Sequence, residues 1–192
     1  IILIDPLLKK LIPSEQPRNG TTASLGVLMG HVFRRSSGRG WRMRKRSMEL
    51  WHKWVRVLNT KESPLTFDKP LVQLAGSENE ACLMQKLIKE RKHLGLEFLS
   101  ANSNQNISRR WPEHNYGGLI SHEDGRINPL QLQKCLLNAI EKSNVQKINH
   151  RVVKIEKRTP TKSRQWILSL SNHTKINCDI IVICSALGTE SL

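Results

Sequence analysis

The sequence contains no long hydrophobic run. Its longest apolar stretches, at residues 1–4 and 180–184, are only a few residues long, whereas a helix needs about 20 apolar residues to cross a bilayer. The sequence therefore predicts no transmembrane segment. Its 11 glycines and 8 prolines follow no fixed period, which excludes a collagen-like chain.

Cysteine is scarce and widely spaced. The four cysteines are Cys82, Cys135, Cys178 and Cys184, and no two of them form a CxxC pair. Structural zinc sites require closely spaced ligands, so the sequence contains no candidate metal site. Cys82 and Cys135 fall on apolar faces of expected helices, and Cys184 falls in an expected strand. This placement predicts buried free thiols in a reducing compartment, and hence a cytoplasmic protein.

Acidic residues are few relative to basic ones. The chain has 31 Lys and Arg against 16 Asp and Glu, which gives a formal net charge of +15 and a pI near 10.2. With 192 residues, 38% of them hydrophobic, it is long and apolar enough for one domain or two small ones. This composition excludes an intrinsically disordered chain.

The order of the expected elements predicts an α/β fold with an antiparallel component. A buried strand at 1–5 is followed by a loop-like stretch to residue 40 that is rich in glycine and proline. Residues 77–80 form a capping box that opens a helix, and Asn128 is placed to cap another whose first residue is Pro129. The remaining expected elements are a helix at 41–59, strands at 70–75, 97–99, 116–121, 147–157, 164–170 and 179–185, and hairpin connections at 158–163 and 171–175.

Four segments carry residues that are typical of a ligand site. Asp5 ends the first strand, and an acid in that position can bind ribose hydroxyls or simply solvate a turn. Residues 20–28 are small and hydroxyl-bearing, which suits either a phosphate contact or an ordinary polar loop. Residues 116–129 combine a Gly-Gly strand, a turn and a capped helix. Residues 178–188 join a hydrophobic strand to a turn of small residues whose backbone amides could face a ligand.

Taken in order and spacing, these segments resemble one family, the FAD-dependent oxidoreductases of the D-amino-acid oxidase and glycine oxidase type. The residues that carry the resemblance are Leu50-Trp51, the Gly-Gly-Leu of 117–119, the stretch 124–129 and the stretch 179–188. The resemblance covers nearly the whole chain. It implies a chain truncated at both ends, without the upstream glycine-rich phosphate turn and without the downstream half.

The resemblance implies a discontinuous, Rossmann-like FAD-binding domain with an inserted mixed α+β substrate domain. The FAD-binding part is expected at 1–60 and 121–192, and the substrate part at 61–120. Because strands 1–5 and 179–185 are then internal to one sheet, this chain on its own is expected to aggregate and to bind FAD poorly.

The resemblance also implies which residues bind FAD. Asp5 matches the ribose-binding acid, and Val153 matches the strand residue whose backbone meets the adenine. The loop that passes the pyrophosphate and the flavin is matched by Thr21, Thr22, Ala23, Ser24 and Gly26. The turn beside the cofactor is matched by Ser185, Ala186 and Gly188, although the family usually has glycine where this chain has Ala186. No catalytic residue is implied. His31 follows the loop on the flavin side and could face the ring, but we favour a solvated loop histidine.

The implied function is oxidation of an amino acid or related amine by hydride transfer to FAD, with a small molecule as substrate. Two alternatives remain open. One is a tRNA-modifying flavoenzyme of the same fold, and the other is a non-catalytic, basic nucleic-acid-binding module.

A basic stretch bears on these alternatives. Residues 34–46 contain no acid, and Trp41 lies among the cations Arg34, Arg35, Arg39, Arg42, Arg44, Lys45 and Arg46. Cations with nearby aromatics are typical of an RNA-binding patch. They also suit acidic small substrates or an anionic surface. We favour a solvated face whose tryptophans pack inward.

Overall fold

The computed structural model of the chain describes residues 1–8, 24–33, 35, 37–101, 115–157, 165–185 and 189. The chain divides into two compact units. Unit 1 comprises Ile1–Arg18 and Ile140–Leu192, and unit 2 comprises Asn19–Ala139. The expected division into a FAD-binding part and a substrate part follows from the family resemblance, and it stays a prediction.

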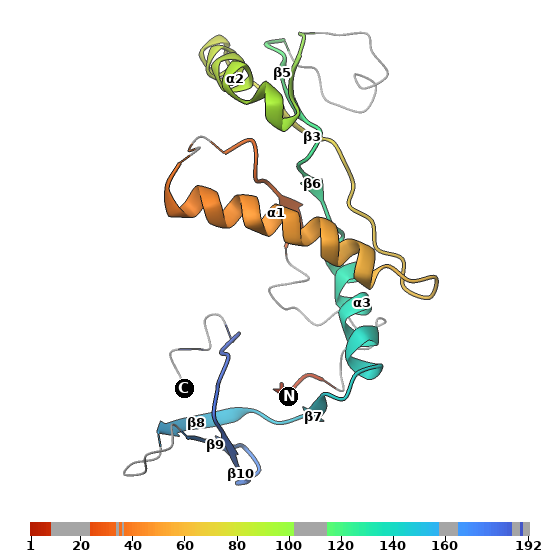
Figure 1. The fold of residues 1–192 in the computed structure, drawn as a ribbon, viewed down its shortest axis with the longest axis vertical. Helices are drawn as coiled ribbons and strands as arrows, with labels where there is room; N and C mark the ends of the chain where they lie inside the picture. Colours follow the sequence, from red (N-terminus) through yellow and green to blue (C-terminus); the bar gives the residue numbers. More distant parts are fainter. Residues whose placement is uncertain are drawn as a thin grey trace. The chain divides into compact units, whose positions relative to one another are not determined.

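Unit 2 contains a three-stranded antiparallel sheet with one helix against it (Figure 1). The strands β3 (Leu71–Leu74) and β4 (Leu96–Leu99) flank the central β5 (Gly118–Ser121), all four residues of which are buried. Glycine is required in β5, because a Cβ on Gly118 would lie 2.3 Å from the carbonyl oxygen of Gln73. The helix is α2 (Glu78–Arg91), which a 3₁₀ turn η1 (Lys92–Leu94) connects to β4.

The ends of α2 follow its sequence signals. The Ser77 hydroxyl accepts a hydrogen bond from the backbone N–H of Glu80 at 3.2 Å, as an N-cap does. The Glu80 carboxylate reaches one residue further back than a capping box usually does and accepts from the N–H of Gly76 at 2.8 Å. Gly95 ends the turn in the left-handed region, with φ of 80°. The predicted capping box is confirmed.

A second layer of unit 2 is built around the long helix α1 (Gly38–Leu58) and the helix α3 (Pro129–Glu141). Two short strands, β2 (Val27–Leu28) and β6 (Gly125–Arg126), pair antiparallel beside them. Asn128 caps α3 by accepting from the N–H groups of the second and third helical residues.

The core of unit 2 forms two hydrophobic clusters. The first joins α2 to the sheet and contains Val32, Ala75, Ala81, Met84 and Leu119. The second joins α1 and α3 and contains Leu65, Ile127 and Cys135, with Trp51, Val55, Leu58 and Leu132 packed against them. Each cluster uses the apolar stripe that the helical spacing predicts.

Unit 1 contains a parallel pair and an antiparallel meander. The strand β1 (Ile2–Ile4) pairs in parallel with β7 (Gln146–Ile148). The meander runs β8 (Val152–Lys157), β9 (Trp166–Leu170) and β10 (Lys175–Cys178), with β9 in the centre. The antiparallel pairing of β9 with β10 confirms the predicted hairpin connection at 171–175. β8 and β9 also pair antiparallel, but the predicted connection at 158–163 lies outside the described residues.

Two strand predictions in unit 1 are wrong. The expected strand at 147–157 is two strands in different sheets, because β7 follows β1 while β8 begins the meander. The expected buried strand at 179–185 is irregular, and the side chains of Ile180 and Val182 are both 81% exposed. A hydrophobic run forms a strand only when a neighbouring strand accepts its backbone hydrogen bonds, and no described strand lies beside this run.

The cysteine prediction is confirmed at one position only. Cys135 is buried, whereas Cys82 and Cys184 are exposed and Cys178 is intermediate. Cys82 lies on the outer side of α2, and Cys184 falls in the irregular run. Within the described residues, no helix is long and apolar enough to cross a membrane.

Candidate functional site

The candidate site in unit 2 is built on residues 24–33, which we call the anchored loop. Its first half is held against β6. The N–H of Ile127 donates to the carbonyl of Gly26 at 2.9 Å, and the guanidinium of Arg126 donates to the carbonyl of Leu25 at 3.0 Å. Gly26 has a φ of 68°, and a Cβ there would lie 1.9 Å from the Ile127 carbonyl oxygen. Only glycine fits this position.

The second half of the anchored loop is held by one carboxylate. Asp124 is fully buried. Its Oδ1 accepts from the N–H of Gly30 at 2.8 Å and from Nδ1 of His31 at 2.9 Å. Its Oδ2 accepts from the N–H groups of His31 and Val32, each at 3.0 Å. Three consecutive backbone amides and one imidazole therefore converge on a single side chain.

The charge of Asp124 follows from these contacts. Burial by itself would raise the pKa of Asp124, but the hydrogen bonds from His31 and from the N–H of Gly30 outweigh it. The pKa of Asp124 therefore lies below its ordinary value, and this buried carboxyl is ionised at neutral pH. Charge-assisted hydrogen bonds of this kind are the strong ones.

Arg91 fixes the same loop from the opposite side. It lies at the end of α2 and is only 2% exposed. Its guanidinium donates to the carbonyl oxygen of His31 at 2.6 Å and to that of Phe33. It also lies 5.2 Å from the ring centroid of Trp41. Asp124 thus takes the amides of the loop and Arg91 takes its carbonyls, so that the backbone at 30–33 is held on both sides.

His31 is not the solvated histidine that we expected. Its side chain is 13% exposed and is paired with Asp124. A second group of charged side chains lies close by. Lys69 donates to Oε2 of Glu123 at 2.8 Å, and Nε2 of His52 is 3.5 Å from the same oxygen.

The charges in this second group affect one another. The hydrogen bond from Lys69 lowers the pKa of Glu123 below its ordinary value. Burial, followed by the nearby Lys69 cation, lowers the pKa of His52. Glu123 is therefore an anion and His52 is neutral at physiological pH.

The anchored loop presents apolar side chains outward. Leu25, Val27 and Met29 are 78%, 39% and 44% exposed. The residues between them point inward, where Leu28 joins a core cluster. At Gly30 a Cβ would lie 2.4 Å from Cγ of the buried Met48. The alternation leaves an exposed apolar strip on an otherwise fixed backbone.

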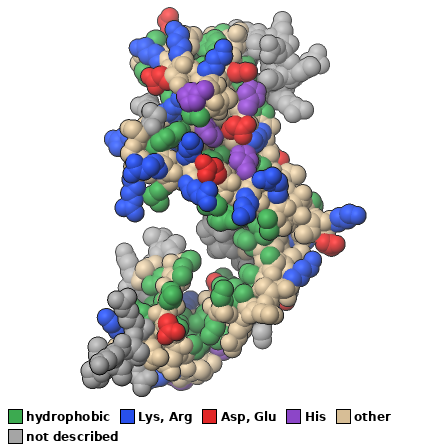
Figure 2. Space-filling model, viewed as in Figure 1, with side chains coloured by type: hydrophobic (Ala, Val, Ile, Leu, Met, Phe, Trp, Pro, Cys, Tyr) green, Lys and Arg blue, Asp and Glu red, His purple; other side chains and the backbone are tan. Residues whose placement is uncertain are grey.

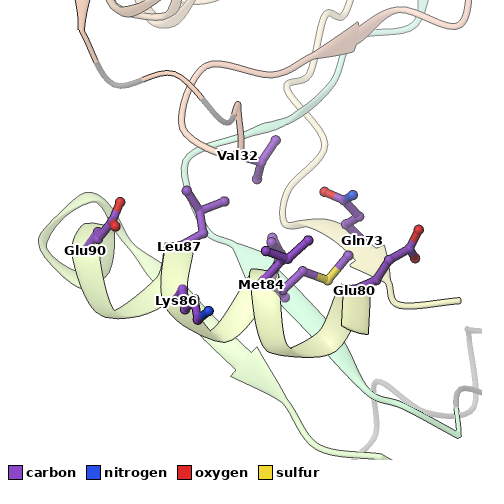
Figure 3. Close-up of a pocket in the computed structure, with 9 residues that line it drawn as sticks. Val32, Gln73, Glu80, Met84, Lys86, Leu87 and Glu90 are labelled. Atoms are coloured by element: carbon purple, nitrogen blue, oxygen red, sulfur yellow. The ribbon is translucent and has the colours of Figure 1, made fainter. Parts of the chain in front are cut away.

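A groove of about 360 Å³ lies along α2, beside the anchored loop (Figure 3). Val32 contributes one wall and faces Met84 and Leu87 (Figure 3). Glu80, Lys86 and Glu90 line its rim. The floor of the groove is apolar. Val32 closes the groove on the side of the loop, and its backbone N–H is held by Asp124.

In unit 1, Asp5 lies where the sequence placed it, directly after β1. Its N–H donates to the carbonyl of Ile148 at 3.1 Å, which continues the pairing with β7. Its Oδ1 accepts from the N–H of Leu7 at 2.7 Å and shapes the following turn. The side chain is exposed. A hollow of about 720 Å³ lies nearby, lined by Leu8, Glu141, Lys147, Ile148, Asn149 and His150.

The other two described site residues of unit 1 are also exposed. Val153 lies at an irregularity in β8, where the register with β9 shifts between Val152 and Lys154. Its backbone is therefore left out of the regular ladder on that side. The Ser185 hydroxyl is 3.0 Å from that of Thr189.

The structure thus brings Ser24 and Gly26 together in unit 2, and it places Asp5, Val153 and Ser185 in unit 1. Thr21, Thr22, Ala23, Ala186 and Gly188 lie outside the described residues. No cluster of three or more metal-ligating side chains occurs within the described ranges.

Sequence reasoning missed Asp124 and Arg91 as the groups that hold the loop. Asp124 lies inside the motif at 124–129, so the motif was identified but the role of Asp124 in holding the loop was not. Arg91 carries no sequence signal, because a basic residue at the end of a helix is common.

Solved structures share this fold. Glycine oxidase from Geobacillus kaustophilus matches with a TM-score of 0.71 and 18% identity, over 88% of this chain and 45% of that protein. L-alpha-glycerophosphate oxidase from Mycoplasma pneumoniae, solved with FAD bound, has a TM-score of 0.67 and 16% identity, over 90% and 44%. L-proline dehydrogenase from P. horikoshii has a TM-score of 0.67 and 12% identity, over 96% and 52%. The chain therefore spans about half the length of these proteins.

No curated protein matches the sequence. At identities of 12–18%, the structural matches show a common mixed α/β fold. The sequence itself carries the assignment further, because the model of one family matches residues 12–192, which is almost the whole chain. That match includes the anchored loop and the motif that supplies Asp124, and by it the chain belongs to the family of FAD dependent oxidoreductases.

Proposed function

We propose that this chain is part of an enzyme that oxidises an amino acid or a related amine with FAD. The observation that carries the proposal is the family match over residues 12–192. Proteins of the same fold include a glycine oxidase, an iminodiacetate oxidase and an L-proline dehydrogenase, whose names all specify an amine. When bound, the flavin would accept a hydride from the carbon next to the substrate nitrogen, and the resulting imine would hydrolyse.

Asp5 and Val153 are proposed to hold the adenosine end of FAD. Asp5 presents an exposed carboxylate at the carboxyl end of the parallel strand β1, where an acid can accept hydrogen bonds from ribose hydroxyls. Val153 is 48% exposed and lies at the register shift in β8. Backbone groups left out of a ladder are free to pair with a flat heterocycle such as adenine.

The anchored loop is proposed to support the pyrophosphate and the flavin ring. The exposed strip of Leu25, Val27 and Met29 offers the apolar contact that a flat ring requires, and Ser24 adds a hydroxyl at its start. Asp124 and Arg91 keep the backbone at 30–33 from moving when a ligand arrives, which lowers the entropy cost of binding. Thr21, Thr22 and Ala23 are proposed to extend this contact, and Ser185, Ala186 and Gly188 are proposed to form the turn beside the cofactor.

In this proposal, residues 1–60 and 121–192 form the cofactor part as an incomplete Rossmann-like domain. Residues 61–120 then belong to the substrate part, which contains β3, β4 and α2. A hydrophobic groove beside the loop, with Glu and Lys at its rim, is consistent with a part that meets small polar substrates.

The direct test uses the complete protein, purified and scanned for the absorbance bands of flavin. It is then mixed without oxygen with a panel of amino acids and secondary amines, and with glycerol phosphate as the non-amine control. We expect one or more amines to bleach the flavin band while glycerol phosphate does not. A protein without flavin, or one bleached only by the non-amine, would contradict the proposal.

Replacing Asp5 by Ala should weaken FAD binding by about ten- to a hundredfold, because lost hydrogen bonds to a charged acceptor are worth roughly 1.5–3 kcal/mol. The fold should survive, since the residue ends a strand. Asp5→Asn is the matched control. It keeps an acceptor for the N–H of Leu7 but lacks the charge, so its affinity for FAD should lie between those of the wild type and Asp5→Ala. Fluorescence titration of the apoprotein with FAD measures all three, and equal dissociation constants would remove Asp5 from the site.

A further inference from the structure

The helix α1 has two faces of different character. Its inner face carries Trp41, Arg44, Met48, Trp51, Val55 and Leu58, at the spacing of one helical stripe. Met48 is buried, and the others are partly buried. This face fixes the helix to the core of unit 2, and most side chains of the opposite face are exposed.

The side chains on the outer face of α1 recur at the same helical spacing. This face carries four cations and four large apolar side chains, with Glu49 as its single acid. We call this set the outer face of α1: Arg39, Arg42, Met43, Arg46, Leu50, Lys53, Trp54 and Val57.

Three of the four apolar members of this face are exposed. Met43 is 60%, Trp54 46% and Val57 68% exposed. The Trp54 ring stands edge-on against Trp51, with centroids 5.5 Å apart, so the inner face positions it. Single exposed apolar residues are common, but three on one side of one helix are not explained by the core.

The charge on this face is positive and only weakly compensated. Arg39, Arg42 and Lys53 are exposed, and Arg46 pairs with Glu49 at 3.0 Å in an ion pair that is more than half exposed. Such a pair is worth little and is easily exchanged. Figure 2 shows Lys and Arg side chains gathered over α1.

We propose that the outer face of α1 binds the surface of an anionic lipid bilayer. A helix with cations beside large apolar residues lies flat in the interface, where its apolar side chains enter the acyl boundary and its cations meet lipid phosphates. Arg and Lys stems lie along apolar surface while their charges stay in water. The 21 residues of α1 give a contact about 30 Å long.

An RNA partner fits this face less well. Phosphate contacts would use the cations, and a base could stack on Trp54. Met43 and Val57 would then have no role, because aliphatic side chains do not contribute to phosphate binding. A purely solvated face explains the cations but leaves the same apolar residues unaccounted for. Of these three, only the bilayer uses both kinds of side chain.

The proposal is tested with the complete protein and sedimented vesicles. One set is phosphatidylcholine alone, and the other contains phosphatidylserine as well. We expect binding to the anionic vesicles to exceed binding to the neutral ones by about tenfold or more. Two triple variants divide the face: Met43→Ser, Trp54→Ser, Val57→Ser removes its three exposed apolar residues, and Arg39→Gln, Arg42→Gln, Arg46→Gln removes three of its four cations. Each should reduce binding to anionic vesicles by about tenfold.

A third variant serves as the matched control. Lys86→Gln, Lys89→Gln, Lys92→Gln removes three exposed cations from α2 and η1 in the same unit, and its binding should stay within about twofold of the wild type. Circular dichroism checks that each variant remains folded.

Three results would overturn the proposal. The first is equal binding to neutral and anionic vesicles. The second is a control variant that loses as much binding as the charge variant. The third is the pattern expected of RNA: bulk tRNA is retained with a steep salt dependence that only the charge variant abolishes, while vesicles are not bound. None of these readouts depends on flavin or on amine oxidation.

Discussion

Replacing Asp124 by Asn is expected to lower the free energy of unfolding by about 2–4 kcal/mol, although the two side chains have nearly the same shape. The carboxylate accepts from the N–H groups of Gly30, His31 and Val32 and from the imidazole of His31. Asn has one acceptor oxygen and one NH₂ group. Whichever way the amide turns, its NH₂ faces at least one buried donor, which then has no acceptor.

Chemical denaturation of the complete protein measures this loss, and Glu123→Gln is the matched control. Glu123 is the neighbouring carboxylate, but it is 50% exposed and pairs with Lys69 at the surface. Losing that pair should cost less than about 1 kcal/mol. If the two variants lose equal stability, then Asp124 does not hold the loop in the way its hydrogen bonds indicate.

The pH dependence gives a second readout of the same contact. Because the pKa of Asp124 is below its ordinary value in the fold, its charge stabilises the native state. This contribution is fully present above the pKa of Asp in the unfolded chain, about 3.9. It is lost as the pH falls through the lower pKa of the folded state. The stability difference between wild type and Asp124→Asn should therefore be constant at neutral pH and shrink in acid.

The Asp124 site also illustrates which features of the structure can be predicted from the sequence and which cannot. The helices α1, α2 and α3 follow from local signals, because apolar spacing, the Ser77 cap and the Asn128 cap each act within a few residues. The family resemblance likewise rests on short motifs. The contact between Asp124 and the loop at 30–32 joins residues more than ninety positions apart, and no local rule predicts such a pairing.

The strand prediction for residues 179–185 was wrong for a related reason. Its composition is that of a buried parallel strand, but composition does not supply the neighbour that a strand requires. The same holds for the exposed thiols. Cys82 was assigned to an apolar helical face from its spacing, yet α2 buries a narrow stripe around Ala81 and Met84 and leaves Cys82 in solvent. How wide a buried stripe is depends on what packs against it.

Replacing Gly26 by Ala is expected to cost about 3 kcal/mol or more and to separate β2 from β6. Two effects add. Alanine at a φ of 68° is strained by roughly 1–2 kcal/mol, and its Cβ would lie 1.9 Å from the carbonyl oxygen of Ile127. That oxygen belongs to backbone, so the contact cannot be relieved by a rotamer change. The anchored loop would have to move away from β6, and the bond from the N–H of Ile127 to the Gly26 carbonyl would break.

Gly38→Ala carries only the first of these effects, because Gly38 has a similar φ of 77° but no atom of the described residues lies within 4 Å of its would-be Cβ. Comparison with it therefore isolates the second effect. Gly38→Ala should cost only the backbone strain, about 1–2 kcal/mol. Thermal unfolding of the two variants side by side gives the difference. A larger fall for Gly26→Ala, accompanied by weaker FAD binding in the complete protein, ties the close approach of loop and strand to the cofactor. If the two variants lose equal stability, then the loop can accommodate a Cβ at Gly26. In that case the close contact with Ile127 does not determine the position of the loop.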